Sequence, residues 1–369
     1  MPHPVSRRGV LAGGLATLAV PAPPSSAGPA GETLGALATA KGLTLGASFA
    51  VHETDGPHGE RYAALYAREV RSLTSELELK LSVLRPDPDT IAFAPADRLF
   101  AFAERQRLAV RGHTLVWNDD VPEWFKALSR REAGYMMDAH IETVLGRYQG
   151  RAAAWDVVNE PIAPWDNQPG NLRAGPFLTA YGEDYIARAF RLARTLEPRA
   201  KLVLNEAFTE TDDARGATFR ASLLALLRRL ADRGAPIDAV GLQCHLSSRH
   251  RYDLPRFTAF VEEIATLGYD IHLTELDCDD GAFPRDIARR DAAVARLYAD
   301  FLGAVLSIRA VTSLTFWQLA DTTSWLYYRD LAERPRAADR PRPLPFDGTF
   351  ARKPAWTAIA DAIRAMPPR

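Results

Sequence analysis

Residues 155–161, Trp-Asp-Val-Val-Asn-Glu-Pro, read as a short buried strand that ends in an amide, a carboxylate and a proline. The two valines favour extended backbone, and Pro161 has no N–H to donate to a neighbouring strand. The segment therefore places Asn159 and Glu160 at the carboxyl end of a strand. In parallel barrels, functional side chains gather at that end.

A second segment follows the same pattern further along the chain. Residues 271–277, Ile-His-Leu-Thr-Glu-Leu-Asp, predict a strand with Glu275 at its tip. Either glutamate alone would fit an exposed loop carboxylate equally well. Two carboxylates at the strand ends of one barrel are what cleavage of a glycosidic bond requires, so the pair favours catalysis.

Strand-like runs alternate with amphipathic stretches along most of the chain. We predict eight strands, at residues 43–51, 70–79, 108–117, 154–160, 201–206, 238–245, 269–275 and 312–319. Helical spacing of apolar residues predicts helices at residues 132–148, 183–196, 218–233, 255–267 and 286–308. The alternation predicts an α/β fold, a single (β/α)8 TIM barrel spanning residues 31–369.

Composition narrows the class of protein. The 369 residues are 47% hydrophobic and 25% charged, as in ordinary globular proteins. The net charge of −1 and the lack of long charge runs give no reason to expect a nucleic acid or a membrane surface as partner. We expect no transmembrane span, because no run of eighteen apolar residues occurs. We also expect a monomer.

The N-terminal residues are predicted to direct export. Arg7 and Arg8 precede a short apolar run that leads into Pro-, Ser- and Ala-rich sequence, which is typical of a secretory signal of the twin-arginine type. We assign residues 1–27 to this signal and expect a periplasmic or extracellular protein. A disordered basic tail is the alternative.

The two cysteines, Cys244 and Cys278, lack the spacing of a metal site. Each stands near the end of a predicted strand. An exported protein could join them in a disulfide, but two buried free thiols are the favoured interpretation.

Polar and aromatic side chains gather at the predicted strand ends and in the loops that follow. They are Glu76, Lys80, His113, Trp117, Asn159, Glu160, Gln243, His245, Glu275, Asp277, Trp317 and Trp325. Hydrogen-bonding groups suit sugar hydroxyls, and flat indole faces suit the C–H surface of a sugar ring. The set predicts a carbohydrate site.

Five ordered motifs make the chain resemble glycoside hydrolase family 10, the endo-1,4-β-xylanases built on a (β/α)8 barrel. They are residues 113–117, 155–160, 241–245 and 273–277 and a C-terminal group at 315–325 and 345–356. The resemblance extends from residue 34 to the C-terminus. It implies retaining hydrolysis of β-1,4-xylosidic bonds in xylan or xylo-oligosaccharides, with no cofactor and no metal, because two carboxylates and water suffice.

The resemblance also implies roles for the matching residues. Glu160 would be the general acid and then the general base, and Glu275 the nucleophile, with their carboxyl groups about 5–5.5 Å apart. The acid must start protonated, so its pKa must be raised. Negative charge on Glu275 would raise it.

Supporting roles follow in the same way. Asn159 would bind the 2-hydroxyl of the sugar at the cut, and His245, oriented by Asp277, would hydrogen-bond Glu275. Gln243 would contact Glu160 or the sugar. Lys80, His113, Trp117 and Trp317 would line the subsite at the cut. Glu76 is a further predicted substrate-binding residue, and Trp325 would be a lid or stacking wall.

Several positions depart from the family pattern. Leu77 stands where the family has an asparagine that would hydrogen-bond the sugar two units from the cut, on the non-reducing side; we call this position the distal subsite. Asn118 and Asp120 stand where the family has histidine and glutamine. The fifth-strand motif Asn-Asp-Tyr-Asn is replaced by residues 205–208, Asn-Glu-Ala-Phe. We therefore expect a glycan preference that differs from plain xylan. A related β-glucan hydrolase and a carbohydrate-binding barrel without turnover are the alternatives, and the presence of both glutamates argues against the binding protein.

Overall fold

The computed structural model describes residues 31–329, 332, 336 and 339–369. The predicted export signal, residues 1–27, lies outside the described residues. Among the described helices, none combines the length and the apolar character needed to cross a membrane.

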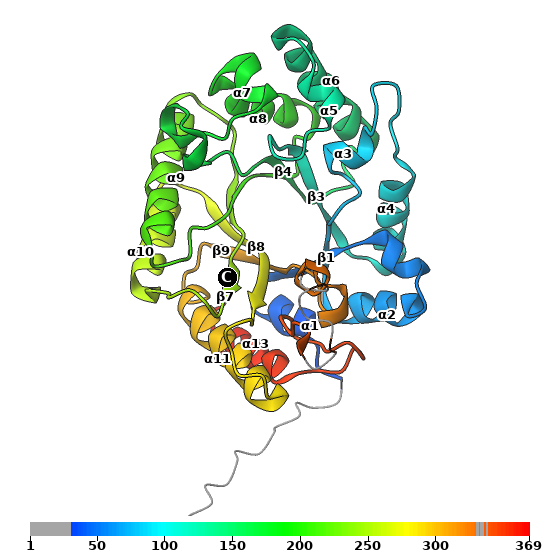
Figure 1. Cartoon of the computed structure of the whole chain (residues 1–369), viewed down its shortest axis with the longest axis vertical. Coiled ribbons are helices and arrows are strands. Elements are labelled where there is room, and N and C mark those ends of the chain that lie inside the picture. The colour runs from blue at the N-terminus through cyan, green and yellow to red at the C-terminus, as the bar shows by residue number, and fades with distance from the viewer. Residues whose placement is uncertain (1–30, 330–331, 333–335, 337–338) are drawn as a thin grey trace, which may run out of the picture.

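Parallel strands form a closed barrel surrounded by helices, which confirms the predicted (β/α)8 fold (Figure 1). The strands are β1 (Thr44–Phe49), β2 (Ser72–Ser75), β3 (Ala109–Val116), β4 (Ala154–Asn159), β5 (Lys201–Glu206), β6 (Ala239–Leu242), β7 (His245–Ser247), β8 (Asp270–Asp279) and β9 (Val311–Phe316). Neighbours pair in the order β6-β5-β4-β3-β2-β1-β9-β8, and pairing between β6 and β8 closes the ring.

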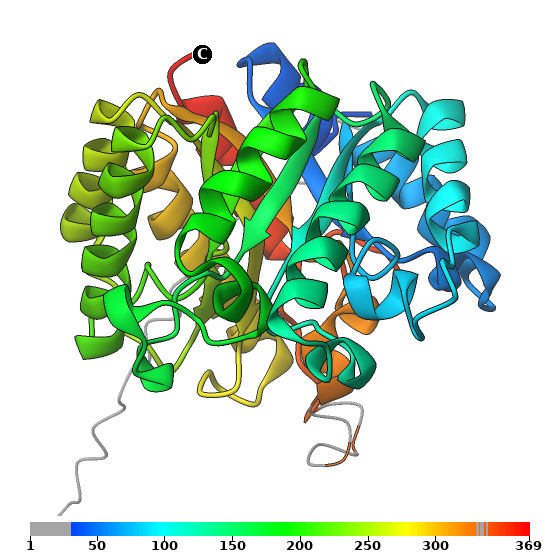
Figure 2. The same ribbon diagram turned by 90° about the horizontal axis from the view of Figure 1, so that it is seen from above.

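Helices cover the outside of the barrel, as the side view in Figure 2 shows. They are α1 (Leu34–Ala40), α2 (Gly59–Glu69), α3 (Leu81–Leu84), α4 (Ala94–Gln106), α5 (Glu123–Lys126), α6 (Arg130–Tyr148), α7 (Pro176–Tyr181), α8 (Asp184–Leu196), α9 (Ala214–Asp232), α10 (Leu254–Thr266), α11 (Ile287–Val305), α12 (Trp325–Arg329) and α13 (Pro354–Ala365). Each long helix buries an apolar stripe against the strands, as expected of amphipathic helices on a sheet.

Three strand predictions need correction. The predicted second strand, 70–79, is in the sheet only at residues 72–75. The predicted sixth strand breaks into β6 and β7 because Cys244 adopts a left-handed φ of 59°. Glu275 lies in the middle of β8 rather than at its tip, because β7 pairs with residues 277–279 and prolongs the strand.

Trp155 belongs to the core. It is fully buried, and its ring lies on Gly112 of β3, where an added Cβ would stand 2.1 Å from the ring. The absence of a side chain at Gly112 is therefore what lets β3 and β4 accommodate an indole.

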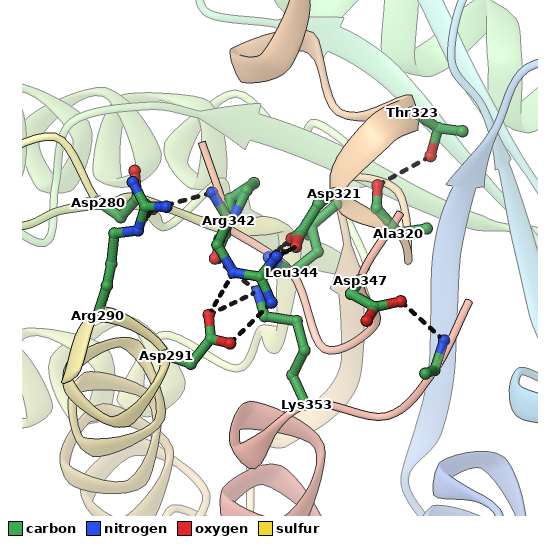
Figure 3. A network of polar contacts seen from close by, with 12 residues as sticks. Asp280, Arg290, Asp291, Ala320, Asp321, Thr323, Arg342, Leu344, Asp347 and Lys353 are labelled. Atoms are coloured by element: carbon green, nitrogen blue, oxygen red, sulfur yellow. Dashed lines mark hydrogen bonds and ion pairs between the residues drawn. The ribbon is translucent and has the colours of Figure 1, made fainter. Parts of the chain in front are cut away.

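A cluster of ion pairs links the segment that follows β9 to helices α11 and α13 (Figure 3). Lys353, at the start of α13, donates to Asp321 Oδ1 at 3.0 Å and to the carbonyl of Arg342 at 2.7 Å. Arg342 in turn pairs with Asp291 on α11 at 2.7 Å. Burial raises the pKa of Asp321 to about 6, against the opposing effect of Lys353. The cluster joins α11 and α13 to the segment between Trp317 and Trp325.

Candidate active site

Glu275 is a buried carboxylate held at both oxygens. Oε1 accepts a hydrogen bond from Asn205 Nδ2 at 2.8 Å, and Oε2 lies 3.2 Å from His245 Nε2. Burial opposes ionisation, but the His245 hydrogen bond and the charges of His113 and His245 outweigh it and lower the pKa of Glu275. Glu275 is therefore ionised at neutral pH, as a nucleophile must be.

His245 links Glu275 to Asp277, as the sequence predicts. The register of β7 and β8 sets His245 opposite Asp277, and Nδ1 lies 2.9 Å from Asp277 Oδ1. Trp325 Nε1 donates to the other oxygen of Asp277 at 2.7 Å. Although burial disfavours the charged ring, Asp277 and Glu275 raise the pKa of His245 well above its usual value. Both ring nitrogens then donate to carboxylates.

Glu160 follows β4 directly and has a left-handed φ of 47°. Its Oε1 accepts from Gln243 Nε2 at 2.8 Å, and its Oε2 accepts from Arg173 Nη2 at 3.0 Å. Burial is the main cause that raises the pKa of Glu160; Arg173 and Gln243 oppose it, and the charge of Glu275 adds to it. The predicted direction is correct, but desolvation contributes more than the like charge that the sequence suggested.

Asn205 joins the two halves of the site. Its Nδ2 donates to Asn159 Oδ1 and to Glu275 Oε1, both at 2.8 Å, and its Oδ1 accepts from Thr274 Oγ1 at 2.7 Å. Gly241 makes room for this amide, because a Cβ there would lie 2.2 Å from Asn205 Oδ1. The sequence placed Asn205 at a strand end but gave it no role.

The residues predicted to line the subsite at the cut lie together. The His113 ring centroid is 5.5 Å from that of Trp317 and 6.3 Å from that of Trp117. Lys80 Nζ stands 5.3 Å from the Trp117 ring centroid. Asp156 orients the His113 ring, because its Oδ2 lies 3.0 Å from His113 Nδ1.

Glu76 accepts hydrogen bonds within the protein at one of its two oxygens. Its Oε2 accepts from Ser48 Oγ at 2.8 Å and from the side-chain amide of Gln318. The side chain is buried, and burial raises its pKa. Its predicted contact with substrate stays a prediction.

The departures from the family pattern have distinct structural outcomes. Leu77 is exposed. Asn118 accepts from the backbone N–H of Phe177 at 3.2 Å, and Asp120 accepts from that of Ser82 at 3.1 Å. Asn118 and Asp120 thus hydrogen-bond the first turns of α7 and α3. Leu77 presents an apolar surface where the family has an amide.

The sequence reasoning missed Arg173, which contacts Glu160, and Trp165, which lies against Arg173. Arg173 contacts Glu160 from the long loop after β4, and its guanidinium lies 5.7 Å from the ring centroid of Trp165. Trp165 is 52% exposed and packs against Phe208 with ring centroids 6.3 Å apart. Neither residue stands at a strand end, so the strand pattern gave no signal for them.

Nothing in the described part of the chain groups three or more His, Cys, Asp or Glu side chains in a way that suits a metal ion. Cys244 and Cys278 are buried and free, in line with the favoured interpretation. The site brings together Glu160, whose pKa is raised, and Glu275, whose pKa is lowered.

Comparisons with known proteins agree with this geometry. The family model described as glycosyl hydrolase family 10 matches residues 33–362. A Dictyoglomus thermophilum protein named beta-1,4-xylanase is 32% identical over 309 residues, covering 81% of this chain and 83% of the relative. Endo-1,4-beta-xylanase A of Caldicellulosiruptor sp. (strain Rt8B.4) is 34% identical over 282 residues, covering 70% of this chain and 39% of that longer relative.

Solved structures give the same result. Native xylanase 10B from Thermotoga maritima superposes with a TM-score of 0.80 at 27% identity, covering 90% of this chain and 98% of the other. Because the family model matches most of the sequence and its strand-end motifs converge in one site, the chain belongs to glycosyl hydrolase family 10.

Proposed function

We propose that this protein is an endo-1,4-β-xylanase that hydrolyses xylan or xylo-oligosaccharides with retention of anomeric configuration. Family membership and relatives named as xylanases support the reaction. A solved neighbour from Thermotoga petrophila RKU-1, 27% identical to this chain, is described in complex with xylobiose. The predicted monomeric state belongs to this proposal.

The observation that carries the mechanism is the opposite ionisation of the two glutamates. Burial raises the pKa of Glu160, so Glu160 can protonate the leaving oxygen. The His245 hydrogen bond and the charges of His113 and His245 together outweigh burial and keep Glu275 ionised, so Glu275 can attack the anomeric carbon. When the glycosyl-enzyme forms, the charge on Glu275 disappears and the pKa of Glu160 falls. Glu160 then accepts a proton from the incoming water.

Release of a chromophore from an aryl β-xylobioside tests the assignment. We expect the wild type to turn over and Glu275→Ala to be inactive. Glu160→Ala should keep most of its kcat/KM on a substrate with a very good leaving group, because formation of the glycosyl-enzyme then needs no proton. Its kcat on that substrate should fall, because the base that activates water is missing, and activity on xylotetraose should be lost. NMR of the first product should show the β-anomer. An α-anomer as first product would contradict retention, and an active Glu275→Ala would contradict the nucleophile.

A β-glucan substrate is the second candidate. A relative from Acetivibrio thermocellus named exoglucanase XynX is 31% identical over 332 residues, and Leu77 removes one amide at the predicted distal subsite. Parallel assays on xylan and on a soluble β-1,4-glucan discriminate the two. A larger kcat/KM on the glucan would replace the xylanase proposal.

A further inference from the structure

The Arg173 guanidinium donates two hydrogen bonds to Glu160. Arg173 Nε donates to the carbonyl of Glu160 at 2.8 Å, and Nη2 lies 3.0 Å from its Oε2. The backbone N–H of Arg173 also donates to the carbonyl of Pro161 at 2.7 Å. One buried arginine thus fixes both the left-handed backbone of Glu160 and the direction of its carboxyl group.

The same guanidinium has a second carboxylate partner. Nη1 of Arg173 lies 3.4 Å from Asp119 Oδ1, on the loop after β3. The Arg173 side chain is only 7% exposed, whereas that of Asp119 is 62% exposed. The positive charge is therefore shared between a buried carboxyl group and a solvated one.

This sharing matters because the two steps of the proposed reaction need Glu160 in opposite states. An arginine committed to Glu160 alone would favour the ionised form and hinder the first step. Asp119 keeps the guanidinium paired while Glu160 carries its proton. Two further carboxyl groups, Glu275 on β8 and Glu206 on β5, interact with Glu160. Neither can supply a positive charge, and Arg173 does so at 3.0 Å.

We propose that Arg173 is a positioning residue for Glu160 and that Asp119 shares its charge, so that Glu160 can alternate between acid and base. The inference rests on the function proposed above. It assigns a task to the loop after β4 and to an aspartate next to the third-strand motif, neither of which the sequence motifs include.

The pH dependence of kcat/KM tests this with two substrates. Hydrolysis of xylotetraose needs a protonated Glu160, whereas 2,4-dinitrophenyl β-xylobioside has a leaving group that needs no proton. With xylotetraose, Arg173→Met should move the basic limb to higher pH by about 1 unit. Asp119→Asn should move it to lower pH by a few tenths of a unit, because the partner charge is exposed and screened. With the dinitrophenyl substrate, the basic limb should not follow these shifts.

Two further variants separate positioning from folding. Arg173→Lys keeps the charge but cannot hold both the carbonyl and the carboxyl of Glu160, so kcat on xylotetraose should fall while the limb stays near that of the wild type. Arg188→Met removes an exposed arginine that pairs with Asp138 far from the site and should behave as wild type. Should Arg173→Met fail to fold, the proposal is still tested by the basic limb of Asp119→Asn and by kcat of Arg173→Lys, both on xylotetraose.

Limbs that stay in place in Arg173→Met and Asp119→Asn, or that move in the same direction, would overturn the proposal. Carboxyl-labelled glutamate NMR, with the Glu160 signal identified by its loss in Glu160→Gln, reports the same titration without substrate. An inert wild type would therefore count against the proposed function, and an unmoved Glu160 titration against the role of Arg173.

Discussion

Glu160 and Glu275 have the same functional group, but their neighbours shift the two pKa values in opposite directions. Glu160 is partly buried, with its side chain 15% exposed, near other carboxyl groups and with one arginine beside it. Glu275 is also buried, but it lies beside a histidine whose positive charge is favoured by Asp277. The choice of acid and nucleophile thus depends on which residue stands next to each carboxyl.

The pH profile of the enzyme should reflect both shifts. On xylotetraose, kcat/KM should be bell-shaped, with an acidic limb below 4.5, where Glu275 becomes protonated, and a basic limb above 4.5, where Glu160 loses its proton. Asp277→Asn weakens the charge on His245, so the pKa of Glu275 rises and the acidic limb should move to higher pH.

Trp325→Phe is the matched control for Asp277→Asn, because it removes one donor to Asp277 but leaves the carboxylate in place. It should move the acidic limb less. If the acidic limb of kcat/KM lay at the same pH in the wild type and in Asp277→Asn, His245 would not set the ionisation of Glu275.

Leu77→Asn should restore a polar contact at the predicted distal subsite. One hydrogen bond contributes about 0.5–1.5 kcal/mol net, so kcat/KM on xylotriose should rise roughly two- to tenfold. Activity on aryl β-xyloside, which does not reach that subsite, should stay unchanged and serves as the control. A variant with unchanged values on both substrates would show that residue 77 does not face the sugar.

At the scale of elements, adjacent strands bring the site together and their side chains are fitted to one another. Gly112 on β3 receives the Trp155 ring of β4, and Gly241 on β6 receives the Asn205 amide of β5. A strand pattern predicts that these strands exist, but it does not show which glycine leaves room for which neighbour.

Gly112→Ala should destabilise the barrel. Its Cβ would stand 2.1 Å from the Trp155 ring, and forcing extra volume into a packed core costs about 1–3 kcal/mol. Urea unfolding followed by tryptophan fluorescence measures the change. Gly146→Ala is the control, because nothing lies within 4 Å of its added Cβ in helix α6, and it should stabilise by about 0.5–1 kcal/mol. Equal effects of the two variants would contradict the packing argument.

At the scale of the molecule, the buried cluster of Asp321, Arg342, Lys353 and Asp291 connects the end of the chain to the barrel (Figure 3). Burial raises the pKa of Asp321 from 3.8 to about 6. The native state therefore holds this proton at pH values where the unfolded chain has lost it. The stabilisation is complete below the unfolded pKa and is lost as the pH rises through about 6.

This linkage predicts a change in stability with pH. Between pH 4 and pH 7, the wild type should lose about 2 kcal/mol more of its free energy of unfolding than Asp321→Asn, because most of the shift from 3.8 to about 6 falls in this window. Urea unfolding at pH 4, 5, 6 and 7 measures both slopes. Asp361→Asn, which removes an exposed carboxylate on α13, should keep the wild-type slope. Parallel curves for the wild type and Asp321→Asn would contradict a raised pKa.

The sequence by itself determined the barrel and the identity of most strand-end residues. Alternating strand-like and amphipathic runs are local features, and the ordered motifs mark residues by their position on those runs. This is why Glu160, Glu275 and His245 could be named in advance.

Only the tertiary structure decided which of these residues touch and what else reaches them. Arg173 and Asp119 approach Glu160 from two different loops, and Asn205 bridges β4 and β8. Asn118 and Asp120 hydrogen-bond the backbone of helices α7 and α3. Such contacts join residues distant in sequence, and the burial that shifts their pKa values exists only once the barrel has closed and excluded water.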